Sequence, residues 1–162
     1  MAGEVGCAKG LLNYHFNTKD QLVALAAERL LADRESLWKE ALDTQDPDAA
    51  ISQAWELIKQ EADSGFWRAW TSLSASSDKV TVRTVNTAID SFSRTLGKSV
   101  DAVLASIGLS PTIAVTELGH LVGAAVQGFG MQLASGVPES HVEGAHAALW
   151  VSILALTRPA ED

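Results

Sequence analysis

The sequence has one cysteine, four prolines and no excess of positive charge, and these shortages exclude several classes of protein. The lone Cys7 excludes a disulfide framework and a cysteine-rich zinc site. The net charge of −8 excludes nucleic-acid binding by bulk charge, so any contact with DNA has to be local. The N-terminus does not pair a basic start with an apolar run, so we expect no secretory signal and a cytoplasmic protein.

Motifs of catalysis and metal binding are also missing. The chain has no glycine-rich phosphate loop after a strand and no G-x-S-x-G or H-E-x-x-H pattern. His141 and His146 lie five residues apart on a predicted helix, and no carboxylate stands at metal-ligand spacing. We therefore expect a protein that is not an enzyme and that holds no metal or cofactor.

One long segment of the chain is almost free of charge. Residues 99–157 contain no Lys or Arg, and residues 110–157 contain only three carboxylates. Such a segment should not face water on all sides, so it is either the core of the domain or also buries a face against a second copy. Its most apolar part, 118–138, contains five glycines, two glutamines and a histidine, which predicts no membrane span.

Apolar residues recur at steps of three and four along most of the chain, which is the period of an amphipathic helix. Pro47 and Pro111 each follow a potential N-cap residue, and Gly108 and Gly136 stand where helices should end. These patterns predict an all-α fold. The expected helices cover residues 8–14, 18–44, 47–63, 65–76, 79–107, 111–135 and 138–157.

The most specific motif lies at residues 6–22, GCAKGLLNYHF followed by NTKDQL. Its residue types predict a short helix, a tight corner and a capped long helix. The small residues Gly6, Ala8 and Gly10 permit the close approach that a helix in a DNA groove requires. The donors that this segment offers to phosphates are Lys9, Tyr14, His15 and Lys19.

This segment resembles the helix-turn-helix of TetR-family bacterial transcriptional regulators, which ends in a pattern close to G-V-S-K-G-T-L-Y-Y-H-F, two residues and a Lys. The matching positions are Gly6, Lys9, Gly10, Leu12, Tyr14, His15, Phe16, Lys19 and Leu22. The resemblance implies a recognition helix in which Tyr14 and Lys19 hold phosphates. The DNA-binding residues expected on this basis are Lys9, Gly10, Asn13, Tyr14, His15 and Lys19. Leu11 and Asn13 depart from the usual Thr and aromatic residue, which leaves the base preference open.

In the family, two further helices precede the recognition helix, whereas only residues 1–5 precede Gly6 here. A recognition helix without these neighbours is too short to be stable alone. We therefore expect either that the natural chain starts upstream or that this protein has lost DNA binding. The expected organisation is a remnant of the DNA-binding head with a connecting helix over 1–44, and an effector-binding and dimerisation domain over 45–162.

Aromatic residues gather in the part of the chain where the family binds small effectors. We predict a pocket that combines these rings with a few polar groups, the usual composition of a ligand site. The expected lining residues are Trp55, Trp67, Trp70, Phe92, His120, Gln127 and Met131. For any single tryptophan, the alternative is that it fills the core, and a buried His120 can instead be satisfied by a backbone carbonyl.

The last two helices carry apolar residues on most of their surface, and the resemblance implies that they pair with those of a second copy. Such pairing would form a four-helix bundle across a two-fold axis. The residues predicted to meet the second copy are Val122, Val126, Phe129, Leu133, Val142, His146, Leu149, Trp150 and Ile153. The alternative is a monomer in which both helices are fully internal.

Together these patterns and the resemblance predict a homodimeric one-component transcriptional regulator. The resemblance implies a repressor, which a small apolar or amphipathic effector would release from operator DNA. The alternative is a dimeric small-molecule-binding or interaction module that does not bind DNA.

Overall fold

The computed structural model describes residues 19–160, most of which lie in six helices that are accompanied by a pair of short strands. The elements are α2 (Lys19–Ala41), α3 (Pro47–Asp63), α4 (Phe66–Ser74), α5 (Lys79–Ser106), β1 (Leu109–Pro111), α6 (Val115–Ala134), α7 (Glu139–Ala155) and β2 (Thr157–Pro159). The chain is therefore mostly helical, as the period of its apolar residues predicts. The helix expected over 8–14 lies outside the described residues.

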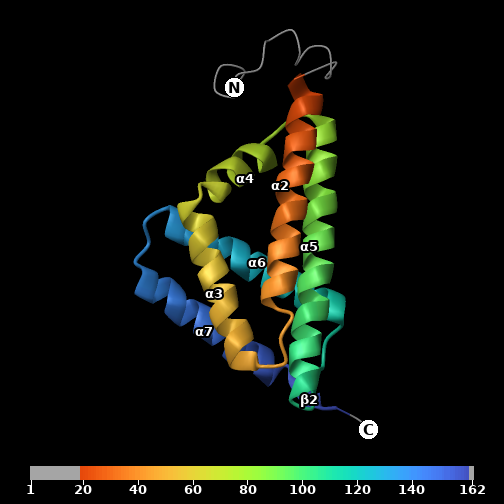
Figure 1. The fold of residues 1–162 in the computed structure, drawn as a ribbon, viewed down its shortest axis with the longest axis vertical. Coiled ribbons are helices and arrows are strands. Elements are labelled where there is room, and N and C mark those ends of the chain that lie inside the picture. The colour runs from red at the N-terminus through yellow and green to blue at the C-terminus, as the bar shows by residue number, and fades with distance from the viewer. Residues whose placement is uncertain (1–18, 161–162) are drawn as a thin grey trace.

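Two long helices, α2 and α5, lie side by side along the longest axis of the molecule and run in the same direction (Figure 1). Polar contacts join the pair, because the Glu35 carboxylate on α2 accepts hydrogen bonds from the hydroxyls of Ser91 and Thr95 on α5. Trp38 of α2, and Leu42 directly after this helix, lie in one hydrophobic core with residues of α3, α5, α6 and α7. The connecting helix thus shares its core with residues that follow position 45.

The helix α6 passes behind α2 and α5, and α7 returns antiparallel to α6 (Figure 1). The helix α3 contacts both α6 and α7. α5 and α6 approach each other closely where Gly97 faces Gly119. A Cβ atom at Gly119 would overlap the backbone carbonyl of Ser93, and one at Gly97 would overlap the carbonyl oxygen of Val115. The helix that approaches closely at Gly119 is therefore α5 of the same chain.

Several predicted helix boundaries are confirmed by their capping groups. The Asp46 carboxylate accepts a hydrogen bond from the backbone N–H of Asp48, and Pro47 occupies the first turn of α3. Gly108 and Gly136 have φ angles of 72° and 86°, the left-handed conformation in which glycine commonly ends a helix.

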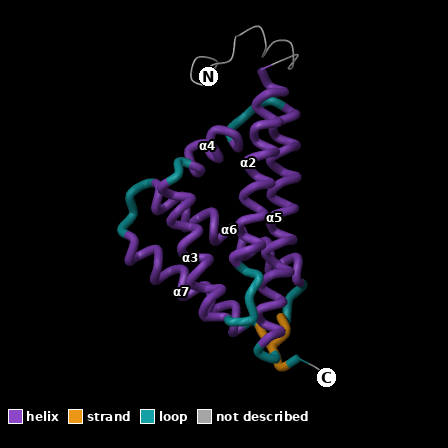
Figure 2. The backbone as a smooth tube through the Cα atoms, in the orientation of Figure 1, coloured by secondary structure: helices purple, strands orange, loops and turns teal. Residues whose placement is uncertain are grey.

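The prediction that a helix begins at Ser110-Pro111 is wrong. Both residues lie in β1, which pairs antiparallel with β2 near the C-terminal end of the described chain (Figure 2). α6 begins only at Val115, and there the backbone N–H of Ala114 donates to the Glu117 carboxylate at 3.3 Å. A strand of three residues is too short to show an alternating pattern, so period alone does not reveal it.

Candidate ligand-binding cavity

A cavity of about 130 Å³ lies between α2, α4, α5 and α6. Its walls are mostly apolar, and a few polar side chains converge on it. The lining residues are Leu31, Arg34, Trp70, Ala88, Ile89, Phe92, Ser93, His120, Gly123, Ala124 and Gln127. Apolar walls with a few polar groups are the usual composition of a small-molecule site.

The structure brings together some of the predicted ligand-binding residues and separates the others. Those that line the cavity are Trp70, Phe92, His120 and Gln127. Trp67 and Met131 instead line a shallow depression between α4 and the end of α6, and Trp55 lies in the core beside His146. The structure therefore does not place these three residues at the cavity with the other four. Trp67 is turned toward α6 because Gly130 there leaves room for its indole ring.

Arg34 is the charged residue among the lining residues that the sequence analysis missed. It is only 9% exposed, although arginine is rarely buried without a partner. The signal was present in the sequence, since Arg34 continues the buried stripe of Ala27, Leu31 and Trp38 on α2. A basic residue within an apolar stripe indicates a buried ion pair or a ligand contact, but the stripe alone does not identify the partner.

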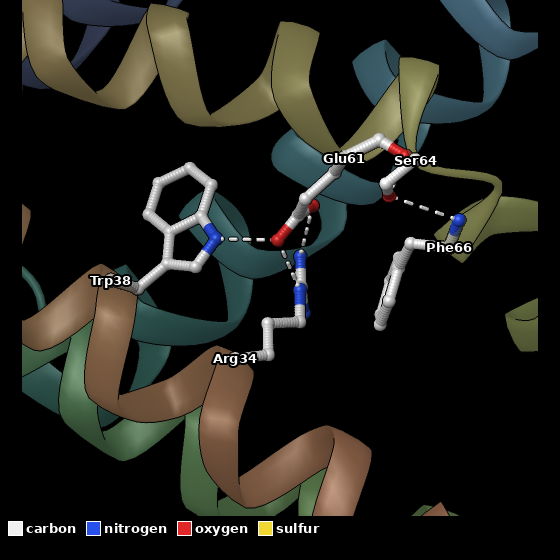
Figure 3. A network of polar contacts seen from close by, with 5 residues as sticks. All are labelled: Arg34, Trp38, Glu61, Ser64 and Phe66. Atoms are coloured by element: carbon white, nitrogen blue, oxygen red, sulfur yellow. Dashed lines mark hydrogen bonds and ion pairs between the residues drawn. The ribbon is translucent and has the colours of Figure 1, made fainter.

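The partner of Arg34 is Glu61, at the end of α3 (Figure 3). Nε and Nη2 of Arg34 donate to the two carboxylate oxygens at 2.6 and 3.1 Å, and Nε1 of Trp38 donates to the same carboxylate at 2.7 Å. The guanidinium also lies 4.0 Å from the ring centroid of Phe92 and 4.9 Å from that of Phe66. This bidentate pair, surrounded by rings, holds a positive charge in a fixed place at the cavity wall.

A second hollow, an open groove of about 430 Å³, lies on the other side of this pair, between α2, α3 and α4. Leu30, Leu37 and Leu57 give it apolar walls, and Arg34 and Glu61 both line it. Arg34 lines the cavity as well, whereas Glu61 lines only the groove. The two spaces therefore meet the Arg34 side chain in common.

A buried histidine lies in a separate aromatic cluster on α7. His146 accepts a hydrogen bond at Nε2 from the indole N–H of Trp150 at 3.0 Å, and its ring lies 5.3 Å from that of Trp55 and 6.0 Å from that of Phe129. Burial among these rings lowers the pKa of His146 from its ordinary value of 6.5, because an imidazolium would lose its hydration. His146 is therefore neutral at pH 7 and serves as an acceptor.

We expect the free energy of unfolding to fall as the pH is lowered through about 6.5. The pKa of His146 is depressed in the folded state, so the unfolded chain binds the proton first and its contribution to stability is lost below pH 6.5. The loss is at most about 1.4 kcal/mol for each pH unit. Urea unfolding at several pH values should show this slope, and His146→Gln should remove it. His141→Gln, at an exposed position of the same helix, should leave it unchanged; an equal slope in both variants would contradict the assignment.

Most residues predicted to meet a second copy lie inside the protomer. Those buried by their own chain are Val122, Val126, Phe129, Val142, His146, Trp150 and Ile153. Leu133 and Leu149 are partly buried and pack against the same core. The structure thus corrects the residue assignment, because side chains enclosed by one protomer do not form its outer surface. Dimerisation itself stays a prediction.

α6 and α7 also expose several apolar residues to solvent. Val151 is 68% exposed, Leu154 is 47% exposed and Leu121 is 40% exposed. The small residues exposed along α7 are Gly144, Ala145, Ala147, Ala148 and Ala155. We refer to Leu121, Val151, Leu154 and these small residues as the outer α6–α7 face. A face with so little polarity on two neighbouring helices would be favourable to bury.

Of the residues predicted to contact DNA, Lys19 alone lies within the described fold. Lys9, Gly10, Asn13, Tyr14 and His15 lie outside the described residues, and Lys19 is the first residue of α2. The DNA-binding set therefore stays a prediction from the sequence motif.

Within residues 19–160, no three His, Cys, Asp or Glu side chains are grouped so that they could hold a metal ion. None of the helices in this range is long and apolar enough to cross a membrane. Comparisons of the chain with protein-family models, with curated proteins and with solved structures each found no match. The likeness to TetR regulators accordingly depends on the motif at residues 6–22.

Proposed function

We propose that this protein is a homodimeric, ligand-responsive transcriptional regulator of the TetR type, in which a small molecule bound in the cavity controls binding to operator DNA. The observation that carries the proposal is the double role of α2. Leu31 and Arg34 on this helix form one wall of the cavity, and the same helix begins at Lys19, within the segment 6–22 that is predicted to bind DNA.

A ligand in the cavity would act on α2 through these wall residues. α5 and α6 form much of the remaining wall, so a ligand that fits one packing of α2 better than another shifts the population toward that packing. In a dimer, movement of α2 would change the separation of the two DNA-reading segments. Half-sites on DNA lie about 34 Å apart, so a small change in this separation prevents both segments from docking at once. A regulator that occupies its operator without the ligand and leaves it when the ligand binds acts as a repressor, and the ligand relieves the repression.

The outer α6–α7 face is the surface that we assign to the second copy. The two helices have 20 and 17 residues, which makes them about 30 and 25 Å long. Two such helices and their symmetry mates can form a four-helix bundle. A stable interface buries about 1,000 Å² of surface or more, and helices of this length offer a surface on that scale. The absence of Lys and Arg from residues 99–157 favours a like partner, because no positive charge has to be buried on either side.

We expect Val151→Arg to dissociate the dimer without unfolding the chain. Val151 is 68% exposed in the protomer, so an arginine there meets water in the monomer and an apolar surface in the dimer. Sedimentation equilibrium of the full chain should give a dimer, and the variant should give a monomer with unchanged circular dichroism. Val80→Arg is the matched control, because Val80 is 52% exposed on α5, away from this face.

The same variants test the regulatory role when DNA is present. The natural chain, with any residues encoded upstream of Met1, is incubated with a pool of random duplexes. It should select two half-sites in inverted order, and Val151→Arg should weaken binding to them more than Val80→Arg does. If the protein is a dimer but selects no DNA sequence, the proposal of a transcriptional regulator is overturned. The alternative of a dimeric ligand-binding module then remains. A monomeric wild-type chain would overturn the assignment of the outer α6–α7 face.

A further inference from the structure

We infer that the ligand of this cavity is a small aromatic carboxylate with one ring, an inference that rests on the proposed ligand-responsive function and adds the chemical class of the ligand. Three features of the described residues lead to it: the size of the cavity, the residues of its apolar walls and the sign of the charge that lines it.

The size of the cavity limits the ligand to about one ring. Its volume is about 130 Å³, and an apolar cavity of roughly 150 Å³ in another protein binds benzene. The apolar wall consists of flat and branched side chains, since Trp70 and Phe92 lie on it with Ile89 and Leu31. A planar ring fits between such side chains and gains from contact with the two aromatic faces. A fused-ring or long-chain ligand would need the walls to move.

The charge at the cavity favours an anion over a cation. Among the described residues that line it, Arg34 is the one charged residue and none is a carboxylate. An ammonium group would therefore enter beside a guanidinium, and the carboxylate that pairs with this guanidinium, Glu61, lines the groove and not the cavity. His120 and Gln127 also line the cavity and add polar groups that can donate to a carboxylate.

Glu61 does not occupy the side of Arg34 from which the ligand would bind. Its carboxylate engages Nε and Nη2, and Nη1 takes no part in this ion pair. Glu61 lines the groove but not the cavity, while Arg34 lines both. A carboxylate in the cavity would thus approach the guanidinium from a different side than Glu61 and form a charge-assisted hydrogen bond to it. The ion pair stays intact and keeps the guanidinium in position.

Three probes of nearly equal shape and different charge test this inference: benzoate, benzamide and benzylamine. Each is titrated from micromolar to millimolar concentration into the full chain at neutral pH in a calorimeter. Benzoate should bind, and benzamide should bind at least about tenfold more weakly because it lacks the charge that strengthens the bond to Arg34. Benzylamine should give no saturable heat. Equal or tighter binding of benzamide or benzylamine would overturn the inferred class.

A cavity-filling variant locates the binding. Ala124 lines the cavity and is exposed, so Ala124→Leu should fill the space without disturbing the core and should abolish benzoate binding. Ala102→Leu is the control, because Ala102 is exposed on α5 and does not line the cavity. Benzoate binding that survives in Ala124→Leu overturns the site, and failure of all three probes overturns the ligand class. Neither result decides dimerisation or DNA selection, which the Val151→Arg experiment measures separately.

Discussion

Replacing Gly119 by alanine is expected to lower the free energy of unfolding by about 3 kcal/mol, the upper end of the usual cost of overpacking. The added methyl group would overlap the backbone carbonyl of Ser93, and a backbone atom inside a helix cannot move aside as a side chain can. α5 and α6 would have to separate, and both carry residues that line the cavity. Urea unfolding followed by circular dichroism measures the loss.

Gly128→Ala is the matched control for this substitution. Gly128 lies on the same helix, and a Cβ atom there would meet no atom within 4 Å. The change should be neutral or stabilise the chain by up to about 1 kcal/mol, because alanine favours the helix more than glycine does. Equal stability of the two variants would show that α5 and α6 are farther apart at Gly119 than the structure places them.

The helices could be predicted from the sequence because period and capping chemistry agree. Pro47 follows Asp46 at the start of α3, and the positive φ angles of Gly108 and Gly136 follow helix ends. Ser110-Pro111 shows the same local chemistry as Asp46-Pro47 but lies in β1. The difference is not local: the Thr112 backbone N–H donates to the carbonyl of Leu156, so this segment is held by residues distant in sequence. Local sequence patterns, such as a capping residue before a proline, do not indicate a contact of this kind.

The sequence predicted which side of α6 and α7 is buried, but not what covers it. Val122, Val126 and Phe129 recur at helical spacing and are buried, as an apolar stripe requires. The stripe has the same appearance whether the covering helices belong to the same chain or to a second copy. Here other helices of the same chain cover it, and the exposed Val151 and Leu154 mark a different face.

The candidate cavity was only partly predictable for a similar reason. Trp67 and Trp70 are three residues apart on α4, and spacing alone places them on neighbouring parts of one face. The structure directs Trp70 to the cavity and Trp67 to Gly130. Arg34 was missed because its burial depends on Glu61, which is 27 positions later in the chain. Whether a side chain lines the cavity or fills the core therefore depends on contacts with residues distant in the sequence.

Removing one member of the Arg34–Glu61 pair is expected to lower the free energy of unfolding by about 3–5 kcal/mol. The two side chains are only 9% and 12% exposed, so Arg34→Met leaves a carboxylate largely out of water with Trp38 as its remaining hydrogen-bond donor among the contacts described. Arg29→Met is the matched control on α2. The Arg29–Asp33 pair has side chains that are 81% and 58% exposed, and its loss should cost less than about 1 kcal/mol.

The double variant Arg34→Met with Glu61→Gln should be more stable than the sum of the single effects predicts. Each single substitution leaves a charge without its partner in a place with little water, whereas the double variant leaves none. The side-chain amide that replaces the Glu61 carboxylate still offers Trp38 an oxygen acceptor, so the cycle isolates the ion pair from the indole hydrogen bond. Additive effects in urea unfolding would mean that Arg34 and Glu61 are each solvated separately. In that case the guanidinium would not be held at the cavity wall.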